Sequence, residues 1–188
     1  RYNQHLLDRG SPVAVAEGVA FVATNAGVVA AFEAESGAAV WAYQYDSYIN
    51  KATSSRYGSV IQLPNQPAVN PIIVTKGKVI TLPIDSPRLL LLSAMDGKPA
   101  GQMADRRGCS DLSAIDSERV LLSGPHLAVV SIATGKEIHT ASGLGIVGRP
   151  AVSSDSVLAS GQGQLISLNL KDYSRSTRVF TNSDCLLG

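Results

Sequence analysis

Short apolar stretches alternate with tight turns along most of this chain, and the alternation repeats. Four segments of roughly 38 residues share one outline, in which four short β-rich stretches are separated by turn residues. The clearest landmark of each segment is its last turn, where a glycine follows a small or acidic residue in three cases. These turns are Ser36-Gly37, Asp96-Gly97, Thr134-Gly135 and, by register, Asp172-Tyr173.

Each segment predicts a four-stranded antiparallel sheet. One apolar strand is expected at residues 19–22, 79–82, 120–122 and 157–159, and the last strand at residues 38–43, 98–102, 136–140 and 174–179. A single sheet of this kind cannot bury both of its faces, whereas sheets stacked around an axis can. The sequence therefore predicts an all-β fold, a β-propeller of four-stranded antiparallel blades. About four blades are present, at residues 11–46, 69–106, 107–143 and 147–180.

The first two turns lie 60 residues apart rather than 38, because the chain has an insertion at about residues 46–67. A long polar loop on a rigid repeat scaffold often carries function. Tyrosine and arginine are favoured at protein interfaces. We therefore predict partner contacts at Tyr48, Arg56 and Tyr57 in the insertion and at Arg88 in an inter-strand turn. The alternative is a surface loop without a role.

Composition narrows the function classes. Of the 188 residues, 45% are hydrophobic and 16% are charged, which is enough apolar content for a packed core. The net charge of +1 gives no electrostatic case for binding nucleic acid. No apolar run reaches the roughly 20 residues that a membrane-spanning helix needs. The chain begins at Arg1, so we expect a processed form or a piece of a longer protein.

The chemistry-bearing residues form no catalytic or metal-binding motif. Cys109 and Cys185 lie 76 residues apart, which is two repeat periods, so we expect two free or otherwise partnered thiols rather than a disulfide between them. Residues 143–148 spell G-x-G-x-x-G, but a strand rather than a helix is expected to follow. This favours a connection between blades over a dinucleotide site. Three histidines lack ligand spacing: His5, His126 and His139.

The first repeat contains the stretch A-F-E-A-E-S-G-A-A-V-W, from Ala31 to Trp41. It resembles the tryptophan-docking motif of the PQQ-like β-propeller family, with Glu33 and Ser36 in place of the usual Asp and Thr. Residues 91–98 and 129–136 resemble weaker copies. Gly101, His139 and Thr177 stand where later repeats would carry the tryptophan. The structural docking residues are Ala31, Glu33, Ser36, Gly37, Trp41, Asp96, Gly97, Thr134 and Gly135.

The resemblance implies a part of an eight-bladed ring, completed by a further segment or a second chain. The family includes quinoprotein dehydrogenases, which hold PQQ and Ca²⁺, and non-catalytic BamB-type members, which bind proteins. We expect a non-catalytic scaffold or protein-binding module, without a cofactor, in the periplasm or outside the cell. The alternative is a piece of a PQQ- and Ca²⁺-dependent dehydrogenase whose active site lies on other blades. A third possibility is a repeat segment of a larger assembly.

Overall fold

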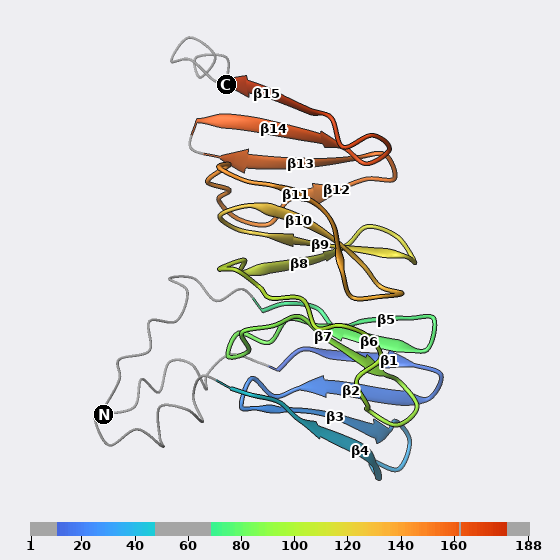
Figure 1. Cartoon of the computed structure of the whole chain (residues 1–188). Helices are drawn as coiled ribbons and strands as arrows, with labels where there is room; N and C mark the ends of the chain where they lie inside the picture. The colour runs from blue at the N-terminus through green and yellow to red at the C-terminus, as the bar shows by residue number, and fades with distance from the viewer. Residues whose placement is uncertain (1–10, 48–68, 162, 180–188) are drawn as a thin grey trace, which may run out of the picture.

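The computed structural model describes residues 11–47, 69–161 and 163–179, and within these ranges the chain is all-β. Four antiparallel sheets follow one another in chain order and lie face to face (Figure 1). Within each sheet the strands pair in sequence order, so every connection inside a sheet is a hairpin. This confirms the predicted all-β fold class. None of the described residues belongs to a helix that could cross a membrane.

Three of the sheets have four strands. The first contains β1 (Val13–Ala16), β2 (Val19–Ala23), β3 (Val28–Glu33) and β4 (Ala39–Gln44). The third contains β8 (Asp111–Ala114), β9 (Arg119–Ser123), β10 (Leu127–Ser131) and β11 (Glu137–Ala141). The fourth contains β12 (Ala151–Val152), β13 (Ser156–Gly161), β14 (Gln164–Asn169) and β15 (Arg175–Val179).

The second sheet has three strands, β5 (Ile73–Thr75), β6 (Lys78–Thr81) and β7 (Leu90–Ser93). The strand expected at residues 98–102 is replaced by a segment that meets the sheet through isolated bridges, Leu92 with Pro99 and Arg88 with Asp105. Proline has no N–H to donate to a continuous ladder. Between the two bridges the segment turns to the third sheet, to which the Gln102 amide donates, and it rejoins the second sheet where the Leu89 amide donates to the Ala104 carbonyl.

The last hairpin of the fourth sheet differs in register from those of the first and third sheets. A β-bulge follows Ala31 in the first sheet and Val129 in the third, so that Trp41 lies opposite Ala31 and His139 opposite Val129. The pairing of β14 with β15 is continuous. A one-residue shift moves side chains to the other face of a sheet. Consequently Ser176, rather than Thr177, takes the place of Trp41 in the fourth sheet.

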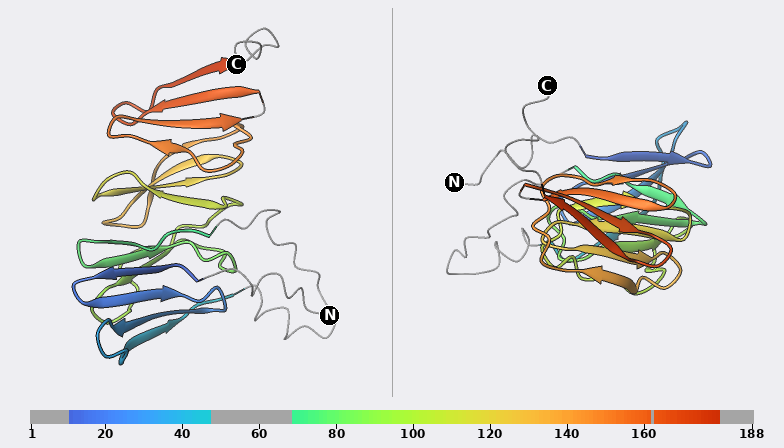
Figure 2. Two further views of the ribbon diagram at one scale, coloured as in Figure 1. Left: turned by 180° about the vertical axis from the view of Figure 1, so that it is seen from behind. Right: turned by 90° about the horizontal axis from the view of Figure 1, so that it is seen from above.

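Figure 2 shows the sheets from two further directions. The core consists of three apolar layers, one between each pair of neighbouring sheets. Successive side chains of a strand point to opposite faces of its sheet, so a sheet that lies between two others packs against both of them. Each large side chain buried in this way contributes roughly 1.5–3 kcal/mol. The first layer includes Phe21, Val29, Val79, Leu90 and Leu92; the second Ile80, Leu82, Leu91, Val120 and Leu122; and the third Leu121, Val129, Val157, Ile166 and Leu168.

Candidate functional site

Trp41, on β4, lies on the turn of the second sheet at Gly97. Its indole Nε1–H donates to the Ala94 carbonyl at 2.9 Å, and its ring packs 5.9 Å from the ring of Phe21. Gly97 has a φ of +70°, and a Cβ placed on it would come within 2.5 Å of the indole ring. Both the backbone conformation and the close approach therefore require glycine at this turn.

The contact of each sheet with the turn of the next sheet is here called a junction. The second junction, between the second and third sheets, uses backbone in place of an aromatic ring. The amide of Gln102, one residue beyond the predicted tryptophan position, donates to the Thr134 carbonyl at 2.9 Å. Gly135 has a φ of +73°, and a Cβ on this residue would collide with the Gln102 carbonyl. The turn of the third sheet is therefore covered by the chain of the second sheet.

The third junction is an aromatic stack. His139, on β11, lies parallel to Tyr173 of the fourth sheet, with ring centroids 4.6 Å apart and an interplanar angle of 6°. Tyr173 has a φ of +59° and takes the position that glycine holds in the other turns. The sequence pattern places His139 at the tryptophan position, and the structure shows the ring that it contacts.

One carbonyl in each covered turn accepts a side-chain N–H from the preceding sheet. Its residue lies three positions before the left-handed residue of the turn. Ala94 accepts from Trp41, Ile132 from the Lys78 Nζ at 2.8 Å, and Leu170 from the Arg119 Nη1 at 2.9 Å. A hydrogen bond to the Tyr173 hydroxyl, followed by the contacts with Asp116, raises the pKa of Arg119. Sequence reasoning missed Lys78 and Arg119.

The residues that precede the turn glycines cap the turns locally. The Ser36 hydroxyl donates to the Glu33 carboxylate, and the Ala38 amide donates to Ser36 Oγ at 3.1 Å. Asp96 accepts from the side chain and the amide of Lys98. The Lys98 side chain, then Ser93 and the Lys98 amide, lower the pKa of Asp96 to about 2. Thr134 accepts from the Lys136 amide at 3.3 Å. These contacts satisfy backbone donors within each turn.

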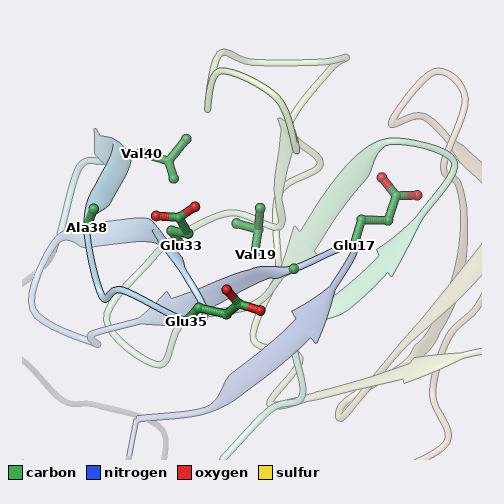
Figure 3. Close-up of a pocket in the computed structure, with 7 residues that line it drawn as sticks. Glu17, Val19, Glu33, Glu35, Ala38 and Val40 are labelled. Carbon is green, nitrogen blue, oxygen red and sulfur yellow. The ribbon is translucent and has the colours of Figure 1, made fainter.

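Val19 stands where the second and third sheets have Lys78 and Arg119, because all three residues begin the second strand and face the next sheet. A pocket of about 390 Å³ lies beside this short side chain (Figure 3). Carboxylates from three glutamates line it. The lining residues are Glu17, Gly18, Val19, Glu33, Glu35, Ala38 and Val40.

The base of the insertion is fixed to the second sheet. Tyr45 follows β4, and its hydroxyl donates to Asp85 Oδ1 at 2.6 Å; both residues are buried. Burial and the neighbouring Asp85 carboxylate raise the pKa of Tyr45. The loop that contains Asp85 also donates a hydrogen bond to the first sheet's turn, from the Ile84 amide to Asn25 Oδ1 at 3.3 Å. The chain therefore leaves the first sheet for the insertion at a rigid point.

Arg106 holds the same loop from the other side. Its Nη1 donates to the carbonyls of Pro83, Ile84 and Ser86 at 2.9–3.1 Å, and its Nε donates to the Cys109 carbonyl at 2.8 Å. Five N–H donors in a fixed fork suit arginine to this role.

Arg88 is exposed on the loop that Arg106 holds, and its amide is bound to Ser86 Oγ at 3.1 Å. The structure therefore presents this predicted contact residue from a fixed backbone. The other predicted contacts, Tyr48, Arg56 and Tyr57, lie outside the described residues.

Cys109 is fully buried, and its Sγ lies 3.4 Å from His126 Nε2. Burial raises the pKa of the thiol to about 12, so the sulfur is held in its neutral form. A thiol in this state is a packed structural group rather than a nucleophile. Cys185 and His5 lie outside the described residues. Within the described ranges, no three His, Cys, Asp or Glu side chains are grouped to hold a metal ion.

The comparisons with known proteins agree on the fold. The family model described as outer membrane protein assembly factor BamB matches residues 4–183. No curated protein matches the sequence. The crystal structure of BamB from Moraxella catarrhalis aligns with a TM-score of 0.65 at 22% identity, over 92% of this chain and 49% of that chain.

Two further solved structures share the architecture. The computationally designed Ika8 protein aligns with a TM-score of 0.56 at 13% identity, over 88% of this chain and 48% of that chain. Quinohemoprotein alcohol dehydrogenase ADHIIG from Pseudomonas putida HK5 aligns with a TM-score of 0.58 at 12% identity, over 90% of this chain and 34% of that chain. The chain thus spans half or less of each of these three structures. On the family match, it belongs to the BamB-type family of PQQ-repeat β-propellers.

Proposed function

We propose that this chain is part of a non-catalytic, extracytoplasmic propeller that binds another protein. The match to the BamB family model over residues 4–183 supports the class. The single structural observation that carries the proposal is the rigid base of the insertion. Tyr45 and Arg106 both hold the loop around Asp85, so a partner would meet a preformed surface there. Preformed surfaces bind at a lower cost in conformational entropy.

The proposed contact surface combines the exposed Arg88 with the insertion at residues 46–67. Arginine on a fixed backbone offers planar hydrogen bonding and loses little conformational freedom on binding. The partner contacts proposed in the insertion are Tyr48, Arg56 and Tyr57. The acceptor on the partner would be a carboxylate or a backbone carbonyl.

The test is affinity purification of the tagged protein from the cells that produce it, with quantitative mass spectrometry. We expect at least one co-purifying protein to fall about tenfold or more in Arg88→Glu and in a deletion of residues 46–67. Arg175→Glu is the matched control, because Arg175 is exposed on β15, in another sheet. If every co-purifying protein persisted in both variants, the proposed contact surface would be wrong.

A quinoprotein activity is the second candidate function, because the PQQ-like family that the sequence resembles includes PQQ-dependent enzymes. The residues of this chain do not fit the vicinal cysteine pair of those enzymes, since Cys109 and Cys185 are far apart and Cys109 packs against His126. We therefore derive no step through PQQ. Dye-linked alcohol oxidation by the purified protein, measured with and without PQQ and Ca²⁺, tests this candidate. A rate that rises with PQQ would replace the binding proposal with an enzymatic one.

A further inference from the structure

The last strand of each sheet has one side that pairs with no further strand, and the four sheets differ in how this side is protected. β4 and β11 each contain a β-bulge, at Val40 and Ile138. In the second sheet, residues 99–105 cover the open side through two isolated bridges. Bulges and covering segments keep an edge strand from pairing with other chains. Among the described sheets, only the fourth ends in a regular, uncovered strand, because β15 pairs with β14 without interruption.

The open side of β15 carries a row of unused backbone groups. The Asn169 amide donates to the Ser174 carbonyl, and the pairing continues in the same register along β15. Opposed residues in an antiparallel pair alternate between hydrogen-bonded and non-hydrogen-bonded positions. The N–H and C=O groups of Arg175, Thr177 and Val179 therefore point away from β14. No residue that the structure describes bonds to these groups, and all five side chains of β15 are exposed.

The open strand is also basic. Arg175 lies opposite Leu168 and Arg178 lies opposite Leu165, so the two arginines are on opposite faces of the sheet. β15 contains no acidic residue. An incoming strand would meet a positive charge on each of its faces, and cross-strand pairs of opposite charge stabilise a sheet. The complementary acidic residues would stand three positions apart in the incoming strand, as the two arginines do in β15.

We infer that β15 binds an extended segment of another protein, which adds a further strand to the fourth sheet. The segment carries two acidic residues three positions apart, with no proline between them. Main-chain hydrogen bonds supply the affinity in this mode of recognition, and the side chains supply the specificity. The inference goes beyond the proposed function, because it concerns a second surface in another sheet and does not depend on the surface around Arg88.

A second copy of this chain is a poor occupant. The chain has 15 acidic residues, and no two of them are three positions apart. Pairing of two β15 strands would also bring four arginines together without an acidic residue on either strand. The charge pattern therefore favours a different protein over self-association.

The test is site-specific photo-crosslinking in the cells that produce the protein, with benzoylphenylalanine in place of Val179. Val179 is 62% exposed on β15. We expect a crosslink to another protein. Mass spectrometry of the crosslinked peptide should identify a segment with two Asp or Glu residues at the inferred spacing.

Thr177→Pro in the same crosslinking protein is expected to reduce the product about tenfold or more, because it removes the central N–H of the open side. Thr177→Val is the matched control, since it keeps this N–H and should keep the crosslink. Arg175→Glu keeps the whole backbone but reverses one of the two charges, so it should reduce the product roughly threefold or more. Circular dichroism would show whether the variants stay folded. If Thr177→Pro does not fold, the comparison of Arg175→Glu with Thr177→Val decides.

Four outcomes would overturn the inference. They are a product that persists in either folded test variant, a crosslinked peptide without the acidic pair, a crosslink only to a second copy, and no crosslink in the folded protein. The Arg88 surface is tested separately. In that affinity purification, Arg175→Glu would lower the yield of a protein held at β15 and keep the yield of one held at Arg88, so each proposal can fail alone.

Discussion

At the scale of single residues, Gly97 and Gly37 form a natural pair. Their φ values are +70° and +72°, but Gly97 lies under the Trp41 ring and Gly37 lies in the open. Substitution by alanine imposes a similar backbone cost of about 1–2 kcal/mol at both positions. The collision with the indole adds to this cost only at Gly97.

We therefore expect Gly97→Ala to lower the free energy of unfolding by about 3 kcal/mol, and Gly37→Ala by about 1 kcal/mol. Urea denaturation of the purified chain measures both values. In a Trp41→Ala background the cost of Gly97→Ala should fall to that of Gly37→Ala. Equal costs in the Trp41 background would show that the indole does not constrain the turn in solution.

Cys109 gives a prediction in alkaline solution. Its pKa in the folded protein is about 12, above the value of about 8.5 for a free thiol. A raised pKa means that the unfolded state releases its proton first. The stabilisation is therefore complete below about pH 8.5 and declines as the pH rises toward 12, by up to about 1.4 kcal/mol per pH unit.

Between pH 8 and pH 10.5, we expect the wild-type protein to lose about 2–3 kcal/mol more unfolding free energy than Cys109→Ala. Chemical denaturation at the two pH values provides the measurement. Cys109→Ala is the control for the wild-type protein, because it keeps Tyr45 and every other group that titrates in this range. Identical losses in the two proteins would contradict a buried, neutral thiol.

At the scale of elements, the sheets are joined by donors that sit on different strands. Trp41 lies on a fourth strand, whereas Lys78 and Arg119 begin second strands, yet all three reach an equivalent carbonyl. The second and third sheets, which lack tryptophan at the docking position, each carry a cation at the start of the second strand. The junction thus keeps its hydrogen bond while the donor changes.

Lys78→Met is expected to lower the free energy of unfolding by about 1–2 kcal/mol, because it removes bonds from a charged donor to the carbonyls of Ile132 and Ala133. Lys98→Met is the control, since the Lys98 side chain is 80% exposed beside Asp96, and it should cost less than about 0.5 kcal/mol. Thermal and urea unfolding would compare the two variants. If Lys78→Met cost no more unfolding free energy than the control, the Lys78 hydrogen bonds would not stabilise the junction.

The repeat turns, and the strands that follow them in the first, third and fourth sheets, could be predicted from sequence, because their signals are local. Glycine and a preceding Ser, Asp or Thr mark a turn wherever they occur. The family resemblance marked Trp41 and Gly97 as docking residues but did not pair them. Lys78 and Arg119 could not be found in this way, because a cation at the start of a strand has the same local sequence whether it meets water or a neighbouring sheet.

Two further features escaped prediction for physical reasons. The Tyr45–Asp85 hydrogen bond joins residues 40 positions apart, and nothing in either local sequence marks a partner. The bulges after Ala31 and Val129, and the continuous pairing of β15, depend on how each hairpin fits its neighbours. Sequence spacing alone therefore placed Thr177 where the structure has Ser176.

At the scale of the whole molecule, stability should follow the number of neighbours of each sheet. In a linear stack each unit is stabilised mainly by the units beside it. The second and third sheets have two neighbours among the described residues, and the first and fourth have one. This ordering is open to measurement without any substitution.

We expect amide hydrogens of β9 to exchange about tenfold or more slowly than those of β2 and β13, which hold the same place in the end sheets. Hydrogen exchange followed by mass spectrometry on the purified chain resolves these peptides. Similar protection of β2 and β9 would mean that the face of the first sheet turned away from the second sheet is already covered in the purified material.

The junctions have a direction along the chain. At each of the three, the residue that covers the turn precedes that turn in sequence: Trp41 comes before Gly97, Gln102 before Gly135, and His139 before Tyr173. A chain leaves the ribosome from its N-terminus, and its parts fold in that order. Each new turn therefore emerges onto a covering residue that is already in place. Synthesis itself can add one sheet at a time, and each finished junction needs nothing that is still to be translated.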